Sequence, residues 1–231
     1  MENTSELVDL VKDYVRKIED KTRDENIERE PNVKEIEAFK SALPAKIQSL
    51  MAKAGVNKRF LSPKSDVKNF DLDGSYYIFG GVGTGKTDLA VALLREIILN
   101  TPPAEGDFGH FHIPYNLAVF VSAPEMFLNI RSGVANNEIS ELELVKKYTE
   151  PKVLILDDLG TEKLSEWVLQ TLYVIVNARY ENMLQTIITS NYTLAEIKNN
   201  FHERIASRIK GMCELVELKG QDKRQKLQVI K

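Results

Sequence analysis

The chain is poor in cysteine and has no long hydrophobic run. Cys213 is the single cysteine among 231 residues, which excludes a disulfide within the chain and a zinc site built from cysteines. No window approaches the roughly eighteen continuous apolar residues that a membrane-spanning helix needs. Residues 1–10 also lack the basic start and apolar centre of a secretory signal. The sequence therefore predicts a cytoplasmic protein that does not enter a membrane.

A strong excess of charge of one sign is also absent. The 31 Lys and Arg side chains are balanced by 34 Asp and Glu side chains, for a net charge of −3. The chain as a whole therefore lacks the excess positive charge typical of nucleic-acid-binding proteins, and any DNA contact needs a local basic patch. One candidate patch is segment 208–231, which holds seven basic and three acidic side chains. Segment 1–35 has the opposite sign, with 11 acidic and 7 basic side chains.

The most informative stretch is a glycine-rich loop. Residues 80–87 read Gly-Gly-Val-Gly-Thr-Gly-Lys-Thr and directly follow the apolar run 76–79. They match the pattern G-x-x-x-x-G-K-[ST] between an expected strand and an expected helix. Glycines let several backbone N–H groups face one polyphosphate, while Lys86 supplies a cation for the β- and γ-phosphates and Thr87 a hydroxyl for Mg²⁺. We therefore expect a phosphate site formed by Gly80, Gly81, Val82, Gly83, Thr84, Gly85, Lys86, Thr87 and Asp88.

Two later strands end in polar residues. Strand 153–157 ends in Asp157 and is followed by Asp158, and strand 185–190 is followed by Asn191. Because ligands bind at the carboxyl ends of strands in α/β sheets, we expect these side chains beside the phosphate loop. Asp157 can then hold Mg²⁺, directly or through water, Asp158 can orient or deprotonate the attacking water, and Asn191 can bond the γ-phosphate. Simpler readings stay open, in which the acids begin a turn and Asn191 caps the next helix.

From residue 75 onward strands and helices alternate, which predicts an α/β fold. The expected strands are 76–79, 117–122, 153–157, 185–190 and 214–218. The expected helices between them are 86–99, 124–132, 139–148, 165–181 and 194–210. This alternation implies a five-stranded, mostly parallel sheet flanked by helices. The domain is expected to cover 56–231, with an irregular lead-in over 56–74 and a long loop over 101–116.

A small helical region, residues 1–55, is expected before that domain. Residues 5–19 place six apolar side chains at helical spacing, which predicts an amphipathic helix. A second helix is expected over 32–54, interrupted near Pro44 and ended by Gly55. A short helix is unstable alone, so the first one needs a partner surface on another protein or on its own domain.

Together these features resemble the AAA+ ATPases, and within them the helicase-loader and transposition-helper group typified by DnaC, DnaI and IstB. The resemblance covers residues 56–226. Besides the phosphate loop it rests on the segments 154–160 (Leu-Ile-Leu-Asp-Asp-Leu-Gly), 165–167 (Ser-Glu-Trp), 177–180 (Asn-Ala-Arg-Tyr), 186–191 (Thr-Ile-Ile-Thr-Ser-Asn), 203–209 (Glu-Arg-Ile-Ala-Ser-Arg-Ile) and 220–224 (Gly-Gln-Asp-Lys-Arg).

The resemblance implies roles for several polar residues. Asn191 falls on the family's sensor position, Arg208 on its arginine-finger position and Arg224 on its second sensor. A finger arginine stabilises charge at the γ-phosphate from a neighbouring subunit, so the family implies a homo-oligomer. Arg204 lies one turn before Arg208 and is the rival finger, unless both lie on a solvated helix face. Asp158 stands where many AAA+ ATPases have glutamate, which is compatible with slow hydrolysis.

The resemblance also implies a function. It predicts an ATPase that uses ATP and Mg²⁺, with Thr87 and Asp157 at the metal, to load a replicative helicase. In that role the N-terminal helix binds a DnaB-type hexamer, and the ATPase domain delivers it to single-stranded DNA. Two alternatives stay open: an IstB-like transposition helper that coats duplex DNA, and a nucleotide-gated adaptor with little hydrolysis. The acidic segment 1–35 favours a protein partner, and therefore the loader.

Overall fold

The computed structural model describes residues 33–105, 111–114, 116–135 and 140–220. The chain divides into two compact units, Met1–Phe39 and Lys40–Lys231, and the second contains the α/β domain. The helix predicted over 5–19 and Arg224 lie outside the described residues. Within the described ranges no helix is long and apolar enough to cross a membrane. The division expected after residue 55 stays a prediction.

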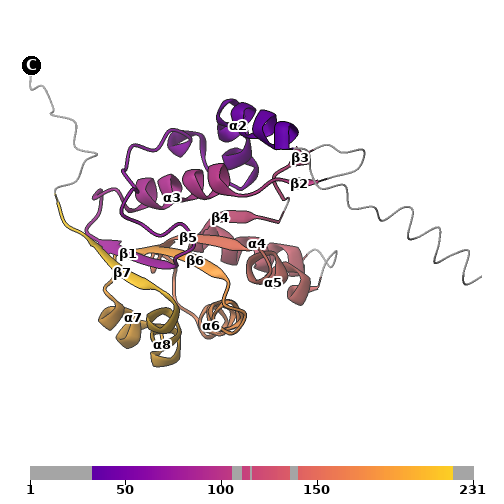
Figure 1. The fold of residues 1–231 in the computed structure, drawn as a ribbon. Helices are drawn as coiled ribbons and strands as arrows, with labels where there is room; N and C mark the ends of the chain where they lie inside the picture. The colour runs from indigo at the N-terminus through magenta and orange to yellow at the C-terminus, as the bar shows by residue number, and fades with distance from the viewer. Residues whose placement is uncertain (1–32, 106–110, 115, 136–139, 221–231) are drawn as a thin grey trace, which may run out of the picture. The chain divides into compact units, whose positions relative to one another are not determined.

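A parallel sheet forms the centre of the second unit. Its strands are β1 (Tyr76–Gly80), β4 (Ala118–Ser122), β5 (Val153–Leu159), β6 (Gln185–Ser190) and β7 (Glu214–Leu218). Among the described residues they form one five-stranded sheet in the order β4-β5-β6-β1-β7, and all neighbouring pairs are parallel (Figure 1). The strand that leads into the phosphate loop, β1, therefore lies between β6 and β7. The predicted five-stranded parallel sheet is confirmed.

Helices cover both faces of this sheet (Figure 1). One face is covered by α3 (Lys86–Asn100) and by buried side chains of α2 (Val33–Lys53). The other face is covered by α4 (Ala123–Ala135), α5 (Glu141–Thr149), α6 (Glu166–Glu181), α7 (Leu194–Asn200) and α8 (Glu203–Met212). Successive strand residues such as Tyr76 and Tyr77 belong to opposite clusters, because side chains of a strand alternate between its faces. Burial on both faces explains the apolar runs in the inner strands β1 and β5.

Two connecting segments lie outside this sheet. The lead-in 56–74 is irregular, as predicted, and contains the short 3₁₀ helix η1 (Lys58–Phe60). Its apolar side chains pack against the α3 side of the core, among them Phe60, Leu61, Phe70 and Leu72. Segment 101–116, expected to be a loop, contains an antiparallel pair of β2 (Ala104–Glu105) and β3 (Phe111–His112).

The single helix predicted over 194–210 is wrong, because α7 and α8 are separate helices. At the break the backbone of His202 is extended, with φ at −171°. The Nδ1 atom of His202 accepts a hydrogen bond from the N–H of Arg204 at 3.1 Å, and this bond caps α8. Buried apolar residues keep a four-residue spacing across the break, so the sequence pattern hides it: Ile197, Phe201, Ile205 and Ile209.

The predicted interruption of the second helix is also wrong, because α2 runs through Pro44. A proline inside a helix costs about 3 kcal/mol, since it removes a hydrogen bond and crowds the preceding turn. Here Pro44 is exposed, while Leu43, Ile47 and Met51 are buried. Burial of such side chains contributes about 1.5–3 kcal/mol each, which is enough to hold the helix across the proline.

Arg179 of α6 connects three elements at the N-terminal ends of the strands, and the phosphate loop lies at the opposite ends. Its side chain is fully buried, and burial lowers its pKa to about 10. The guanidinium donates hydrogen bonds of 2.6–3.4 Å to the Thr186 hydroxyl and to the carbonyls of Tyr148, Pro151, Lys152 and Gln185. These acceptors lie at the end of α5 and the starts of β5 and β6, so one side chain fixes the positions of all three.

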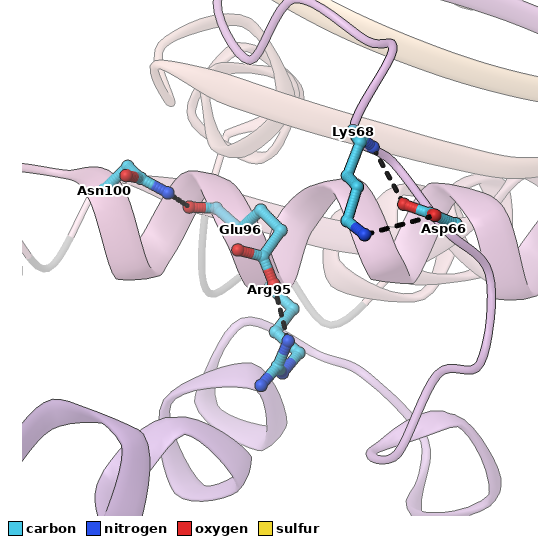
Figure 2. A network of polar contacts seen from close by, with 5 residues as sticks. All are labelled: Asp66, Lys68, Arg95, Glu96 and Asn100. Atoms are coloured by element: carbon cyan, nitrogen blue, oxygen red, sulfur yellow. Dashed lines mark hydrogen bonds and ion pairs between the residues drawn. The ribbon is translucent and has the colours of Figure 1, made fainter.

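We expect Arg179→Leu to lower the free energy of unfolding by about 3 kcal/mol or more, because each buried acceptor left without a donor costs about 1–3 kcal/mol. Chemical denaturation followed by circular dichroism measures this change. Arg95→Leu is the control, since Arg95 bonds to its neighbour Glu96 on α3 with its side chain 41% exposed (Figure 2). It should change stability by less than about 0.5 kcal/mol. Equal effects of the two substitutions would contradict the role of Arg179.

Candidate nucleotide-binding site

The phosphate-loop residues connect β1 to α3 through two glycines that no other residue replaces easily. Gly80, the last residue of β1, has φ at +150°, and a Cβ atom there would lie 2.2 Å from the carbonyl oxygen of Leu218. Gly85 has φ at +102° and is the N-cap of α3. Both positions require the conformational freedom of glycine. The strand, loop and helix of the sequence motif are therefore present in the structure.

Lys86 folds back over this loop. The residue is 6% exposed, and its Nζ atom donates hydrogen bonds to the carbonyl oxygens of Gly80 and Gly81, each at 2.9 Å. A further bond of 2.8 Å reaches the Oδ1 atom of Asn191. The residue after β6 thus lies beside the loop lysine. An ammonium surrounded by oxygens in this way can exchange them for phosphate oxygens.

Thr87 and Asp157 lie in direct contact. The Thr87 hydroxyl donates to the Asp157 carboxylate, at 3.0 and 3.1 Å from its two oxygens. Asp157 is 6% exposed, and burial raises its pKa above the usual value, although hydrogen bonds from Thr189 and Thr87 oppose the shift. A hydroxyl and a carboxylate are the hard oxygen ligands that Mg²⁺ prefers. These residues therefore fit a magnesium ion.

Thr189 of β6 connects the two acids, although sequence reasoning missed it. Its hydroxyl donates to Oδ1 of Asp157 at 2.6 Å and accepts the N–H of Asp158 at 2.9 Å. The backbone of Asp158 has φ at +55°, which is uncommon for a non-glycine residue. A threonine inside a strand looks like an ordinary strand former, so the sequence carried no signal of this contact.

A cavity of about 770 Å³ lies over these residues. Among the predicted site residues it is lined by Val82, Gly83, Gly85, Lys86, Thr87, Asp88, Asp158 and Asn191. Another part of its lining was not predicted and comes from the lead-in and from the turn after β5: Arg59, Phe60, Ser62, Lys64, Ser65 and Thr161. The cavity is within the usual size range of small-molecule and cofactor sites.

Asp88 joins the two parts of this lining. Its carboxylate accepts hydrogen bonds from the N–H of Lys64 at 3.1 and 3.2 Å, and from the N–H and hydroxyl of Ser65 at 2.8 and 2.7 Å. The lead-in is thereby fixed to the first turn of α3, the helix that carries Lys86 and Thr87. Asp88 therefore shapes the cavity, and its direct contact with a nucleotide stays a prediction.

The predicted finger arginines do not line this cavity. Arg208 is half-buried on α8, and its Nε atom donates to Oδ1 of Asn177 at 2.8 Å. Arg204 is exposed on the same helix. Within the described residues no group of three or more His, Cys, Asp or Glu side chains could hold a metal ion, so a magnesium ion at Thr87 and Asp157 would need further ligands from phosphate or water.

A protein-family model, that of the IstB-like ATP binding proteins, matches residues 11–229. The chain belongs to this family. It is thus a member of the DnaC, DnaI and IstB group of AAA+ ATPases, as the motifs indicated.

Two relatives in this group are replicative helicase loaders. The chain is 28% identical to DnaI of Bacillus subtilis over 127 residues, which are 54% of this chain and 35% of DnaI. It is 25% identical to DnaC of Buchnera aphidicola over 158 residues, which are 68% of this chain and 58% of DnaC. The chain therefore spans less than two thirds of the length of either relative.

Solved structures show the same fold. The crystal structure of the DnaC helicase loader has a TM-score of 0.53 and 27% identity, over 71% of this chain and 100% of that one. AMPPCP-bound DnaA from Aquifex aeolicus has a TM-score of 0.50 over 66% of this chain and 43% of DnaA, and at 23% identity it shows the fold alone. The predicted AAA+ fold with its phosphate loop is confirmed.

Proposed function

We propose that the cavity binds ATP with Mg²⁺. Membership of an ATP-binding family and the contacts around Lys86 support this proposal. Lys86 exchanges its carbonyl partners for oxygens of the β- and γ-phosphates. Thr87 and Asp157 hold the magnesium, directly or through water, and the ion neutralises phosphate charge when it is bound. The glycine-rich loop supplies backbone N–H groups to the same phosphates.

We also propose that the chain hydrolyses ATP slowly. Asp158, which lines the cavity, orients the attacking water and accepts its proton. Asn191, 2.8 Å from the Lys86 Nζ atom, bonds the γ-phosphate and relays its presence to β6 and α7. Arg208 of a second copy completes the charge stabilisation, so hydrolysis requires assembly. Arg224 acts as the second sensor from the segment after β7.

In this proposal the ATP cycle drives the delivery of a replicative helicase to single-stranded DNA. The observation that carries this proposal is the likeness to the DnaC helicase loader. The two chains are 27% identical, and the match covers 100% of the solved DnaC chain. The loaders DnaI and DnaC are relatives by sequence as well. Residues 1–55 provide the contact with a DnaB-type hexamer in this proposal.

Capture of a DnaB-type hexamer tests the loader function. With ATP and Mg²⁺, the full chain should co-elute with the hexamer in size-exclusion chromatography. Removal of residues 1–32 should abolish capture and preserve ATP binding. This cut is cleaner than one at residue 55, because Ile47 and Met51 of α2 belong to the core. No capture by the full chain would contradict the loader function, and unchanged capture by the shortened chain would contradict a role in this contact for residues 1–32, which include the helix predicted over 5–19.

A transposition helper is the second candidate, because the matching family is described by its IstB-like members. Such a protein would coat duplex DNA and would not need a helicase. Duplex coating in the presence of ATP, without capture of the hexamer, would favour this candidate over the loader. ATP binding without measurable turnover would instead indicate a nucleotide-gated adaptor.

A further inference from the structure

Arg208 of α8 is held by two side chains of α6. Its Nε atom donates to Oδ1 of Asn177 at 2.8 Å, and its Cζ atom lies 4.6 Å from the centroid of the Tyr180 ring. Asn177 and Tyr180 are three residues apart in α6, so they lie on the same face of that helix. Within the described part of the chain, the Nη1 and Nη2 atoms of Arg208 have no hydrogen bond or ion pair.

A glycine in α8 leaves room for the Tyr180 ring. A Cβ atom at Gly211 would lie 2.9 Å from Cε2 of Tyr180, so a side chain there would displace the ring. Gly211 is three residues after Arg208, and the ring therefore contacts one face of α8 over a full turn. Arg204, the rival finger, is exposed and has no comparable ring contact among the described residues.

We propose that Asn177 and Tyr180 are positioning residues that hold Arg208 ready for the γ-phosphate of ATP bound by a second copy of this chain. The proposal rests on the proposed function, because it takes Arg208 as the finger. Arg208 does not line the cavity of its own chain. The phosphate that it meets therefore belongs to a neighbouring copy.

Two physical effects favour this arrangement. A long arginine side chain loses rotamer entropy when it is fixed. Because Asn177 and Tyr180 already hold Arg208, part of this entropy is lost before two copies of the chain assemble, and assembly costs less. The bond at Nε and the stack on the ring also leave the two Nη atoms available, and these planar donors bind phosphate oxygens in pairs. Assembly can then complete the site without reordering the finger.

Mixtures of two defective subunits test this positioning role. A Lys86→Ala subunit offers Arg208 but cannot use ATP, and an Arg208→Ala subunit binds ATP but offers no finger. The mixture should hydrolyse ATP at least about tenfold faster than either variant alone. Asn177→Leu in the Lys86→Ala subunit should lower the mixed rate about tenfold, and Tyr180→Leu about fivefold. The same substitutions in the Arg208→Ala subunit should change it by less than about twofold.

Conservative variants separate positioning from folding. Asn177→Asp keeps an acceptor and Tyr180→Phe keeps the ring, so each should retain the mixed rate within about twofold. The melting temperature of every variant reports its fold, and in the Arg208→Ala subunit the ATP affinity does so as well. If a leucine substitution lowered the mixed rate equally in either subunit, or if neither leucine substitution lowered it, only the positioning role would be overturned. An Arg208→Ala chain with the wild-type rate would overturn the finger itself, and this proposal with it.

Discussion

Replacing Lys86 with alanine is expected to weaken ATP binding by about a hundredfold or more. Lys86 is 6% exposed, and its ammonium bonds the loop carbonyls and Asn191. A hydrogen bond to a charged group contributes about 1.5–3 kcal/mol, and two such bonds to phosphate correspond to at least about a hundredfold in Kd. Titration of each variant with ATP in the presence of Mg²⁺ measures the loss.

Lys68→Ala is the matched control for this substitution. Lys68 lies in the lead-in with its side chain 87% exposed, and its Nζ atom is 3.9 Å from the Asp66 carboxylate (Figure 2). Because exposed ion pairs contribute little, ATP affinity should change by less than about twofold. An unchanged affinity in Lys86→Ala would contradict the role of the loop lysine. Equal losses in both variants would indicate an unspecific effect of charge.

Asp158→Asn is expected to lower ATP hydrolysis about a hundredfold or more, while ATP affinity stays within about threefold. The amide cannot accept a proton from water, but it keeps the size of the side chain. Asparagine also tolerates the positive φ of +55° at this position. The bond of 2.9 Å between the backbone N–H and Thr189 is therefore retained. Phosphate release measures turnover, and a parallel ATP titration measures binding.

Asp66→Asn is the control for that experiment. Asp66 is an acid of the lead-in whose side chain is 71% exposed, and it does not line the cavity. Hydrolysis should stay within about twofold of the wild-type rate. Wild-type turnover in Asp158→Asn would argue against this residue as the base. No turnover in the wild-type chain would contradict hydrolysis as a whole and favour the adaptor.

The strands were the most predictable part of the fold. β6 and the edge strand β7 have the predicted bounds, 185–190 and 214–218. In β6 four consecutive β-branched residues, 186–189, favour a strand. The break between α7 and α8 was not predictable, since Phe201 keeps the apolar spacing of a continuous helix. Pro44 led to the opposite error, a predicted break inside a continuous helix, because the packing of α2 outweighs the local cost of proline.

The arrangement of the candidate site was predictable where a motif carries its own chemistry. The contacts of Lys86 with Asn191 and of Thr87 with Asp157 join the residues that the sequence singled out. The remaining contacts depend on the tertiary fold. Asp88 reaches Ser65 across 23 positions of the chain, and Thr189 reaches Asp157 across 32. An aspartate in a first helical turn and a threonine in a strand are common, so neither indicated its distant partner.

Isothermal titration calorimetry of the full chain with ATP and Mg²⁺ decides whether the cavity is a nucleotide site. We expect saturable binding of one ATP per chain, and its loss in Lys86→Ala with the fold intact. A wild-type chain that takes up no ATP in the presence of Mg²⁺ would contradict the assignment of this cavity and every function built on it.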